Sequence, residues 1–176
     1  GTVQVLPGAG AVVGEALSLH PGVQKVSFTG STAIGRRIAQ NATHSFKRTT
    51  LELGGKSAQL VFDDADLERA VPGIAMGLFA NQGESCAIGS RVLVHRSIHD
   101  QVVDGLREAQ RAQVVGDPFD PSTTVGPLIS ARHRDRVRGY VESGRTEGAT
   151  LVAGGAAVDR PGFFVEPTVF AGHHDL

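Results

Sequence analysis

The sequence has 176 residues, of which 40% are hydrophobic and 20% charged, the composition of an ordinary globular protein. Its 17 Lys and Arg residues nearly balance its 18 Asp and Glu residues, so the net charge of −1 provides no field to attract nucleic acid or an anionic membrane. The single cysteine, Cys86, excludes an internal disulfide, and no apolar run reaches the roughly 20 residues of a membrane-spanning helix. We therefore expect a cytoplasmic protein that binds neither nucleic acid nor membrane.

Extended and helical patterns alternate through the first third of the chain. Strands are predicted at 3–6, 25–28 and 48–53, and helices at 11–19 and 31–42. Strands that alternate with helices in this way usually form a parallel sheet with crossover helices, which makes the predicted fold class α/β.

The same alternation continues downstream. Ser97 and Asp100 form a capping-box pattern ahead of a helix that carries Ile98, Val102 and Leu106. The other predicted elements are a strand at 57–62, a helix at 67–78, a strand at 91–95, a loop at 116–127, a helix at 130–143, and strands at 150–152 and 165–170.

Two glycine-bearing segments are candidates for binding an anion. Pro7 to Gly14 reads PGAGAVVG and follows a predicted strand, but its glycines depart from the G-x-G-x-x-G spacing of a dinucleotide fingerprint, so spacing alone does not favour phosphate binding. In FTGSTAIG, the residues Gly30, Ser31 and Thr32 precede a helix, whose first amides and dipole attract anions. By itself this second segment is better explained by a polar N-cap.

Two further segments carry candidate catalytic groups. Glu52 lies between two leucines in a strand that ends in glycines, where it either faces solvent or reaches a cleft as a general base. Cys86 lies in the polar segment NQGESCAIGSR between a helix and a strand. A buried cysteine there is inert packing, whereas an exposed thiolate is an effective nucleophile toward a carbonyl carbon.

The histidines do not form a convincing metal site. The pairs His95 with His99 and His173 with His174 are close in sequence, but neither has a third ligand, and the first pair crosses a strand-to-helix junction. We therefore predict no metal ion.

Seven motifs, taken together and in order, resemble the aldehyde dehydrogenase superfamily along essentially the whole chain. Glu52 and Cys86 are also 34 residues apart, as in the hydrolytic members of that family. The motifs are PGAG, FTGSTAIG, LELGGK, NQGESC, GSR, VGDP and EPTVF.

The resemblance implies an incomplete aldehyde dehydrogenase-like α/β fold, an internal fragment in which residues 1–51 end the Rossmann-like NAD(P)-binding domain and residues 52–176 begin the catalytic domain. It implies that Cys86 attacks an aldehyde, that hydride passes to NAD or NADP, and that Glu52 activates water to hydrolyse the resulting thioester to a carboxylic acid. Gly30, Ser31, Thr32 and Gly35 would bind the cofactor, with Leu53 beside the nicotinamide.

The resemblance further implies a small-molecule aldehyde substrate and a homodimeric or homotetrameric parent protein. The family's upstream oxyanion Asn and adenosine-site Lys, and its downstream ribose-binding Glu, have no counterpart in these residues, so we expect the isolated chain to have little or no activity. Two alternatives are a non-catalytic truncated remnant and a thiol-based redox sensor at Cys86.

Overall fold

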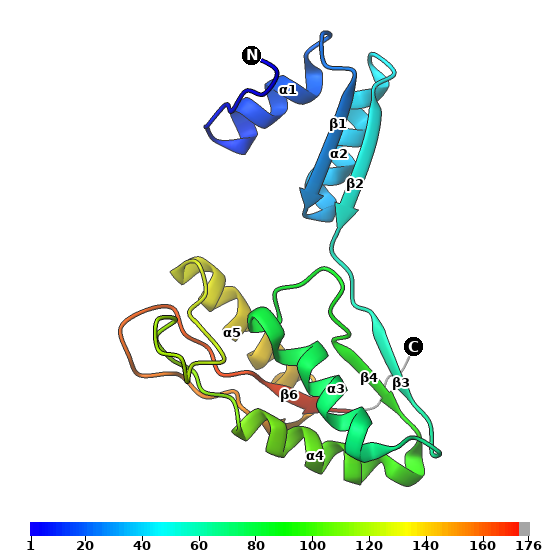
Figure 1. Cartoon of the computed structure of the whole chain (residues 1–176), viewed down its shortest axis with the longest axis vertical. Coiled ribbons are helices and arrows are strands. Elements are labelled where there is room, and N and C mark those ends of the chain that lie inside the picture. Colours follow the sequence, from blue (N-terminus) through cyan, green and yellow to red (C-terminus); the bar gives the residue numbers. More distant parts are fainter. Residues whose placement is uncertain (173–176) are drawn as a thin grey trace. The chain divides into compact units, whose positions relative to one another are not determined.

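The computed structural model describes residues 1–172 (Figure 1), in which the chain forms two compact units. The first unit comprises Gly1–Gly55 and the second begins at Lys56. The division between these compact units lies after Gly55, so Glu52 belongs to the first unit.

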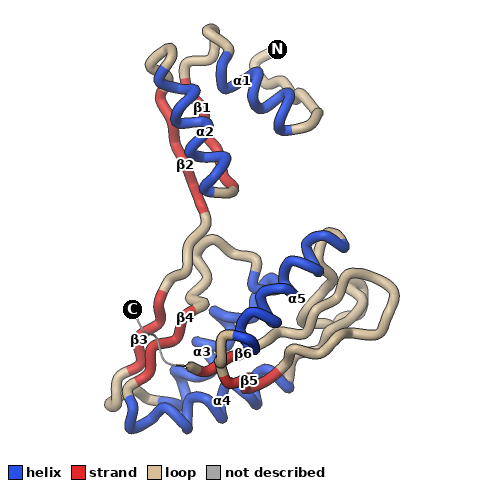
Figure 2. Tube along the Cα trace, turned by 180° about the vertical axis from the view of Figure 1, so that it is seen from behind, coloured by secondary structure: helices blue, strands red, loops and turns tan. Residues whose placement is uncertain are grey.

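The first unit contains a parallel strand–helix–strand arrangement. Strands β1 (Lys25–Gly30) and β2 (Arg48–Leu53) pair in parallel, with helix α2 (Thr32–Thr43) as the connection. Figure 2 shows α2 lying along the strand pair. The helical segment before β1 consists of a π-helical turn, Gly10–Gly14, and helix α1 (Glu15–Leu19).

Polar side chains join α1 to α2. The Glu15 carboxylate accepts hydrogen bonds from Arg37 Nη2 at 2.9 Å and from Asn41 Nδ2 at 3.2 Å. The same Asn41 amide donates to Ser18 Oγ at 2.8 Å, and Ser18 is only 2% exposed. The packing of the two helices removes the Ser18 hydroxyl from water, and this network supplies it with a hydrogen-bond partner.

The strand predicted at 3–6 is wrong. Residues 1–9 form no helix or strand, and Val3 and Val5 are each 84% exposed. Within residues 1–55 only β1 and β2 pair, so this apolar run has no neighbouring strand to satisfy its backbone groups.

The second unit begins with another parallel strand–helix–strand arrangement. Strands β3 (Ala58–Val61) and β4 (Arg91–Val94) are connected through helix α3 (Leu67–Phe79), which is followed by a short 3₁₀ segment, Ala80–Gly83. Helix α4 (His99–Arg111) packs on α3. The core of this unit consists of the buried side chains of Val61, Ile74, Ala75, Phe79, Val102 and Leu106.

The last part of the second unit differs from the predicted parallel arrangement. Helix α5 (Ala131–Thr146) precedes β5 (Thr150–Ala153), which pairs with β6 (Val169–Ala171) in an antiparallel manner. The strand predicted at 165–170 is therefore too long at its start, because Pro167 has no amide to donate and its carbonyl accepts from Gln110. The α/β fold class is confirmed: among the described residues the pairs β1–β2 and β3–β4 are parallel and β5–β6 is antiparallel.

The capping box predicted from Ser97 and Asp100 is also wrong. Helix α4 has Ile98 as its N-cap, which has no side-chain capping bond, and a 3₁₀ turn, Arg96–Ile98, precedes it. His95 caps this turn by accepting from the Ser97 amide at 3.4 Å. Within residues 1–172, none of the helices combines the length and the apolar character needed to cross a bilayer.

Candidate active site

The predicted cofactor residues gather at one edge of the β1–β2 pair. In the parallel register Thr29 is opposite Glu52 and Gly30 is opposite Leu53, so both strands end at the same edge. Glu52 is exposed and Leu53 is half-buried. This edge therefore presents a carboxylate to solvent next to the start of α2.

The N-terminus of α2 lies directly after this edge. Ser31 is the N-cap, and its Oγ accepts from the Ile34 amide at 3.4 Å. Ser31 and Thr32 are exposed, and the amides of a first helical turn have no partner within the helix. The capping role considered from the sequence is thus present, and it leaves the amide of Thr32 available for an anion.

At two of the glycines here an added side chain would meet a neighbouring side chain. A Cβ at Gly30 would lie 2.5 Å from Phe28 Cζ, and a Cβ at Gly35 would lie 2.6 Å from Leu53 Cδ2. Gly35 is buried beneath the Leu53 side chain, so it lets α2 approach β2 closely. Gly35 could not be paired with Leu53 from the sequence, because their contact depends on the strand register.

The segment from Pro7 to Gly14 does not form a dinucleotide fingerprint. No strand precedes it, and its last five residues form a π-helical turn. A Cβ at Gly10 or Gly14 would meet nothing within 4 Å. The close helix–strand packing for which that fingerprint uses its last glycine is therefore not present at Gly14.

Cys86 lies in an exposed turn of the second unit. The Cys86 loop, residues 84–90, connects the 3₁₀ segment after α3 to β4. Cys86 is a free, exposed cysteine. Within its turn the Ile88 amide donates to the Ser85 carbonyl at 3.3 Å and the Ala87 amide donates to Ser85 Oγ at 3.4 Å. The thiol is thus accessible, and the two hydrogen bonds across the turn that carries it are long.

The start of the Cys86 loop follows three left-handed residues. Asn81, Gln82 and Gly83 have φ values of 51°, 56° and 75°. Asn81 Nδ2 donates to the Glu84 carbonyl at 3.0 Å, and the Glu84 carboxylate lies 3.4 Å from His133 Nδ1 in α5. Asparagine and glycine tolerate this conformation better than most residues, which explains two of the three positions.

The end of the Cys86 loop is held by β3 and by the segment just before it. Gln59 Nε2 donates to the Gly89 carbonyl at 2.8 Å, and Arg91 Nε donates to the Lys56 carbonyl at 2.9 Å. Neither Gln59 nor Arg91 was singled out from the sequence. The available signal was alternation, because Gln59 shares a strand face with the buried Val61.

The predicted site residues therefore fall into two groups. Glu52 and Leu53 lie at one edge of the first unit with the start of α2, whereas Cys86 lies in the second unit. The histidine pair His95 and His99 is engaged locally, with Ser97 and Asp100 respectively. His173 and His174 lie outside the described residues, and among residues 1–172 no group of three His, Cys, Asp or Glu side chains is arranged for a metal ion.

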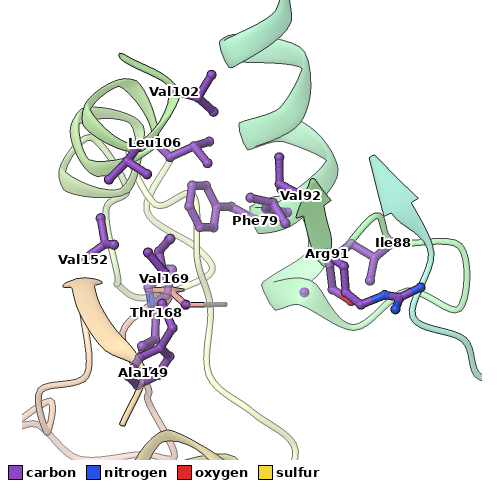
Figure 3. Close-up of a pocket in the computed structure, with 18 of the residues that line it drawn as sticks. Phe79, Ile88, Arg91, Val92, Val102, Leu106, Ala149, Val152, Thr168 and Val169 are labelled. Carbon is purple, nitrogen blue, oxygen red and sulfur yellow. The ribbon is translucent and has the colours of Figure 1, made fainter. Parts of the chain in front are cut away.

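A large apolar cavity lies within the second unit (Figure 3). Its volume is about 1400 Å³, and Phe79, Val102, Leu106, Val152 and Val169 are among the side chains around it. Ile88 of the Cys86 loop lines this cavity but Cys86 does not. The thiol is therefore not a part of this cavity.

Comparison with known proteins identifies close relatives. Retinal dehydrogenase 2 of Gallus gallus is 47% identical over 172 residues, which are 97% of this chain and 33% of the relative. The putative aldehyde dehydrogenase DhaS of Bacillus subtilis (strain 168) is 43% identical over 175 residues, covering 99% of this chain and 35% of the relative. The chain thus spans about a third of the length of these relatives.

A solved structure gives the same result. The NAD+ complex of the aldehyde dehydrogenase from Bacillus cereus matches with a TM-score of 0.91 and 43% identity, covering 94% of this chain and 34% of that one. The model of the aldehyde dehydrogenase family matches residues 1–175. This chain therefore belongs to the aldehyde dehydrogenase family.

Proposed function

We propose that this chain carries the nucleophile and the general base of an NAD(P)-dependent aldehyde dehydrogenase of the hydrolytic type. The proposal is supported chiefly by Cys86, whose thiol is free and exposed in a polar loop, in a chain that belongs to this family. Glu52, exposed at the end of β2, is the proposed base. The substrate class is a small-molecule aldehyde and the product a carboxylic acid.

Cys86 begins the reaction as a thiolate. Its Sγ forms a bond to the aldehyde carbon, and the carbonyl oxygen takes a proton to give a thiohemiacetal. A bound NAD or NADP supplies the acceptor for the hydride that leaves this carbon. Loss of the hydroxyl proton together with that hydride leaves a thioester on Cys86, two electrons more oxidised than the thiohemiacetal.

Glu52 acts on water in the second half of the reaction. Its carboxylate takes a proton from water, the oxygen bonds to the thioester carbon, and the carbon–sulfur bond breaks to release the acid and the Cys86 thiolate. The exposure of Glu52 supports this role, because a general base must reach solvent or a bound water. Glu52 has the further proposed role of helping to deprotonate Cys86.

The start of α2 fits the diphosphate of a dinucleotide. Ser31 and Thr32 are exposed at the N-terminus of a 12-residue helix, where amide groups and the helix dipole favour negative charge. We assign Gly30, Ser31, Thr32 and Gly35 to cofactor binding, with Leu53 beside the nicotinamide. In this assignment Gly35 acts by allowing α2 to pack on Leu53, not by touching the cofactor.

We extend this proposal to the domains, the location and the oligomeric state of a longer family member that contains these residues. Residues 1–51 would belong to the NAD(P)-binding domain and residues 52–176 to the catalytic domain. The enzyme would be a cytoplasmic homodimer or homotetramer. Because these residues cover about a third of the relatives, we expect the isolated chain to have little or no dehydrogenase activity.

The thioester step can be tested without a cofactor. p-Nitrophenyl acetate acylates a nucleophilic thiol directly, so mass spectrometry after brief incubation should find acetyl on Cys86 and none in Cys86→Ser. Glu52→Gln should still acetylate but should release acetate about 10² to 10⁴ times more slowly, the usual contribution of a general base. Glu68→Gln, at an exposed position in α3, is the matched control and should behave like the unmodified chain.

The dehydrogenase proposal and the reduced activity of this chain need separate measurements. A family enzyme that contains these 176 residues should form NADH or NADPH when an aldehyde is added, and Cys86→Ser should abolish it. Absence of that activity would contradict the proposed function. Steady NADH formation by the 176-residue chain itself would contradict only the expectation of low activity.

A non-catalytic folding remnant is the second candidate. The observation that favours it is apolar surface, since Phe46 and Phe119 are each 95% exposed and Ile129 is 85% exposed. Calorimetry with NAD distinguishes the two, because binding supports a functional cofactor edge and its absence favours the remnant.

A further inference from the structure

The position of the Cys86 thiol depends on how its loop is attached to the rest of the second unit. The turn at residues 85–88 has hydrogen bonds of 3.3 and 3.4 Å, and Cys86 is exposed. Such bonds are long compared with the usual 2.9 to 3.0 Å of protein amides. Shorter bonds lie on either side of this turn: Asn81 is bonded to Glu84 at the start of the loop, and the Ser90 amide donates to the Ile88 carbonyl at 3.0 Å. At the end of the loop, the Gln59 side chain bonds the Gly89 carbonyl at 2.8 Å from outside the loop.

Gln59 occupies a position that alternation would give to an apolar residue. It is two residues from Val61 in β3, and Val61 is 6% exposed in the core of the unit. Gln59 is half-buried, and its Nε2 donates to the Gly89 carbonyl at 2.8 Å. A polar side chain at such a position is stable because it has this partner.

The loop and α3 both leave room for the Gln59 side chain. A Cβ at Gly89 would lie 2.5 Å from Gln59 Cγ, and a Cβ at Gly77 would lie 3.4 Å from Gln59 Nε2. Gly89 is three residues after Cys86, and Gly77 lies in α3. The amide therefore sits between the helix that precedes the thiol and the segment that follows it.

We infer that Gln59 is a positioning residue for Cys86, acting through its hydrogen bond to the Gly89 carbonyl. The inference rests on the proposed function for the importance of the thiol, but the contact and its effect on the loop are independent of aldehyde chemistry. A side chain without a donor at this position leaves the Gly89 carbonyl without its partner and releases the end of the loop.

Two substitutions separate the donor from the shape of the side chain. Gln59→Met keeps an unbranched side chain of similar length without a donor, and Gln59→Glu keeps the shape but places an ionised carboxylate against the Gly89 carbonyl. In both variants we expect amide hydrogen exchange of residues 86–90 to become about tenfold faster at pH 7, as expected for the loss of one hydrogen bond. The labelling rate of Cys86 should move toward that of the unfolded chain.

Protonation of the glutamate introduced by Gln59→Glu distinguishes loss of the hydrogen bond from a general loss of packing. The reference pKa of a glutamate is about 4.3, and a protonated carboxyl can again donate to Gly89. The exchange difference between Gln59→Glu and the unmodified chain should therefore shrink as the pH is lowered from 7 to about 3.5, whereas that of Gln59→Met should stay constant. Arg91 of β4 is one register step away and is bonded to the Lys56 carbonyl, and α3 has no charged residue within one turn of Gly77.

Gln101→Glu and Gln101→Met are the matched controls, because Gln101 is exposed in α4. Both should leave exchange and labelling unchanged. Exchange in residues 86–90 within twofold of the unmodified chain in both Gln59 variants would overturn the inference. So would faster exchange spread evenly over residues 56–172, because Gln59 would then stabilise the whole unit and not the thiol loop. Neither measurement requires aldehyde turnover, so a failure of this inference can be distinguished from a failure of the proposed function.

Discussion

At the scale of single residues, Gly35 links the cofactor edge to the packing of α2 on β2. A Cβ added there would lie 2.6 Å from Leu53 Cδ2. We expect Gly35→Ala to lower the free energy of unfolding of the first unit by about 1 to 3 kcal/mol, because overpacking outweighs the better helix propensity of alanine. Chemical denaturation followed by far-UV circular dichroism measures this change.

The matched control is Gly14→Ala, since Gly14 has φ −64° and ψ −40° and a Cβ there would meet nothing within 4 Å. It should stabilise the same unit by about 0.4 to 1 kcal/mol. Equal effects of the two substitutions would show that Leu53 moves aside without cost.

The protonation of Asp120 is tied to local hydrogen bonds with Ser122. The Ser122 backbone amide, and to a lesser extent the Ser122 hydroxyl, hold the pKa of Asp120 below its ordinary value. A lowered pKa contributes stability above the unfolded value of 3.8 that is lost as the pH falls through the folded value. Ser122→Ala should raise the pKa only in part, because the amide remains, and an NMR titration of the Asp120 carboxyl measures this. A return to the ordinary value would contradict the assignment of the larger effect to the backbone.

At the scale of elements, a single N-cap residue, Ser130, is expected to stabilise helix α5. Ser130 Oγ accepts from the His133 amide at 3.2 Å. Ser130→Ala should lower the free energy of unfolding of the second unit by about 0.5 to 2 kcal/mol. Ser143→Ala, at an exposed interior position of the same helix, should be neutral or slightly stabilising in the same denaturation experiment.

Some patterns in the sequence were sufficient to predict an element and its bounds. The strand at 48–53 was predicted with its observed bounds, and the helix expected at 31–42 forms one residue later, because alternation and a polar cap are local signals. The strand at 3–6 failed because a strand needs a partner, which local sequence does not specify. The Gln59 contact was missed because its glycines come from two other segments, and only the folded chain brings them to it.

At the scale of the whole molecule, the second unit has an interior centred on α3 and α4. Leu106 is 4% exposed in this core, whereas Met76 on α3 is 71% exposed. Leu106→Ala should destabilise the second unit by about 2 to 5 kcal/mol, and Met76→Ala by a much smaller amount. Cys86 labelling under increasing urea reports on this unit, since Cys86 is the only cysteine. Similar urea midpoints for both variants would mean that the core is not where the structure places it.

The proposal that Cys86 is a nucleophile assisted by Glu52 is tested most directly by labelling the thiol. The rate of alkylation with iodoacetamide is measured at pH 7 in the folded chain, in the chain unfolded by urea, and in Glu52→Gln. We expect the folded chain to react faster than the unfolded chain and Glu52→Gln to lose this advantage. Slower reaction in the folded chain, or an unchanged advantage in Glu52→Gln, would contradict the proposed roles of the two residues.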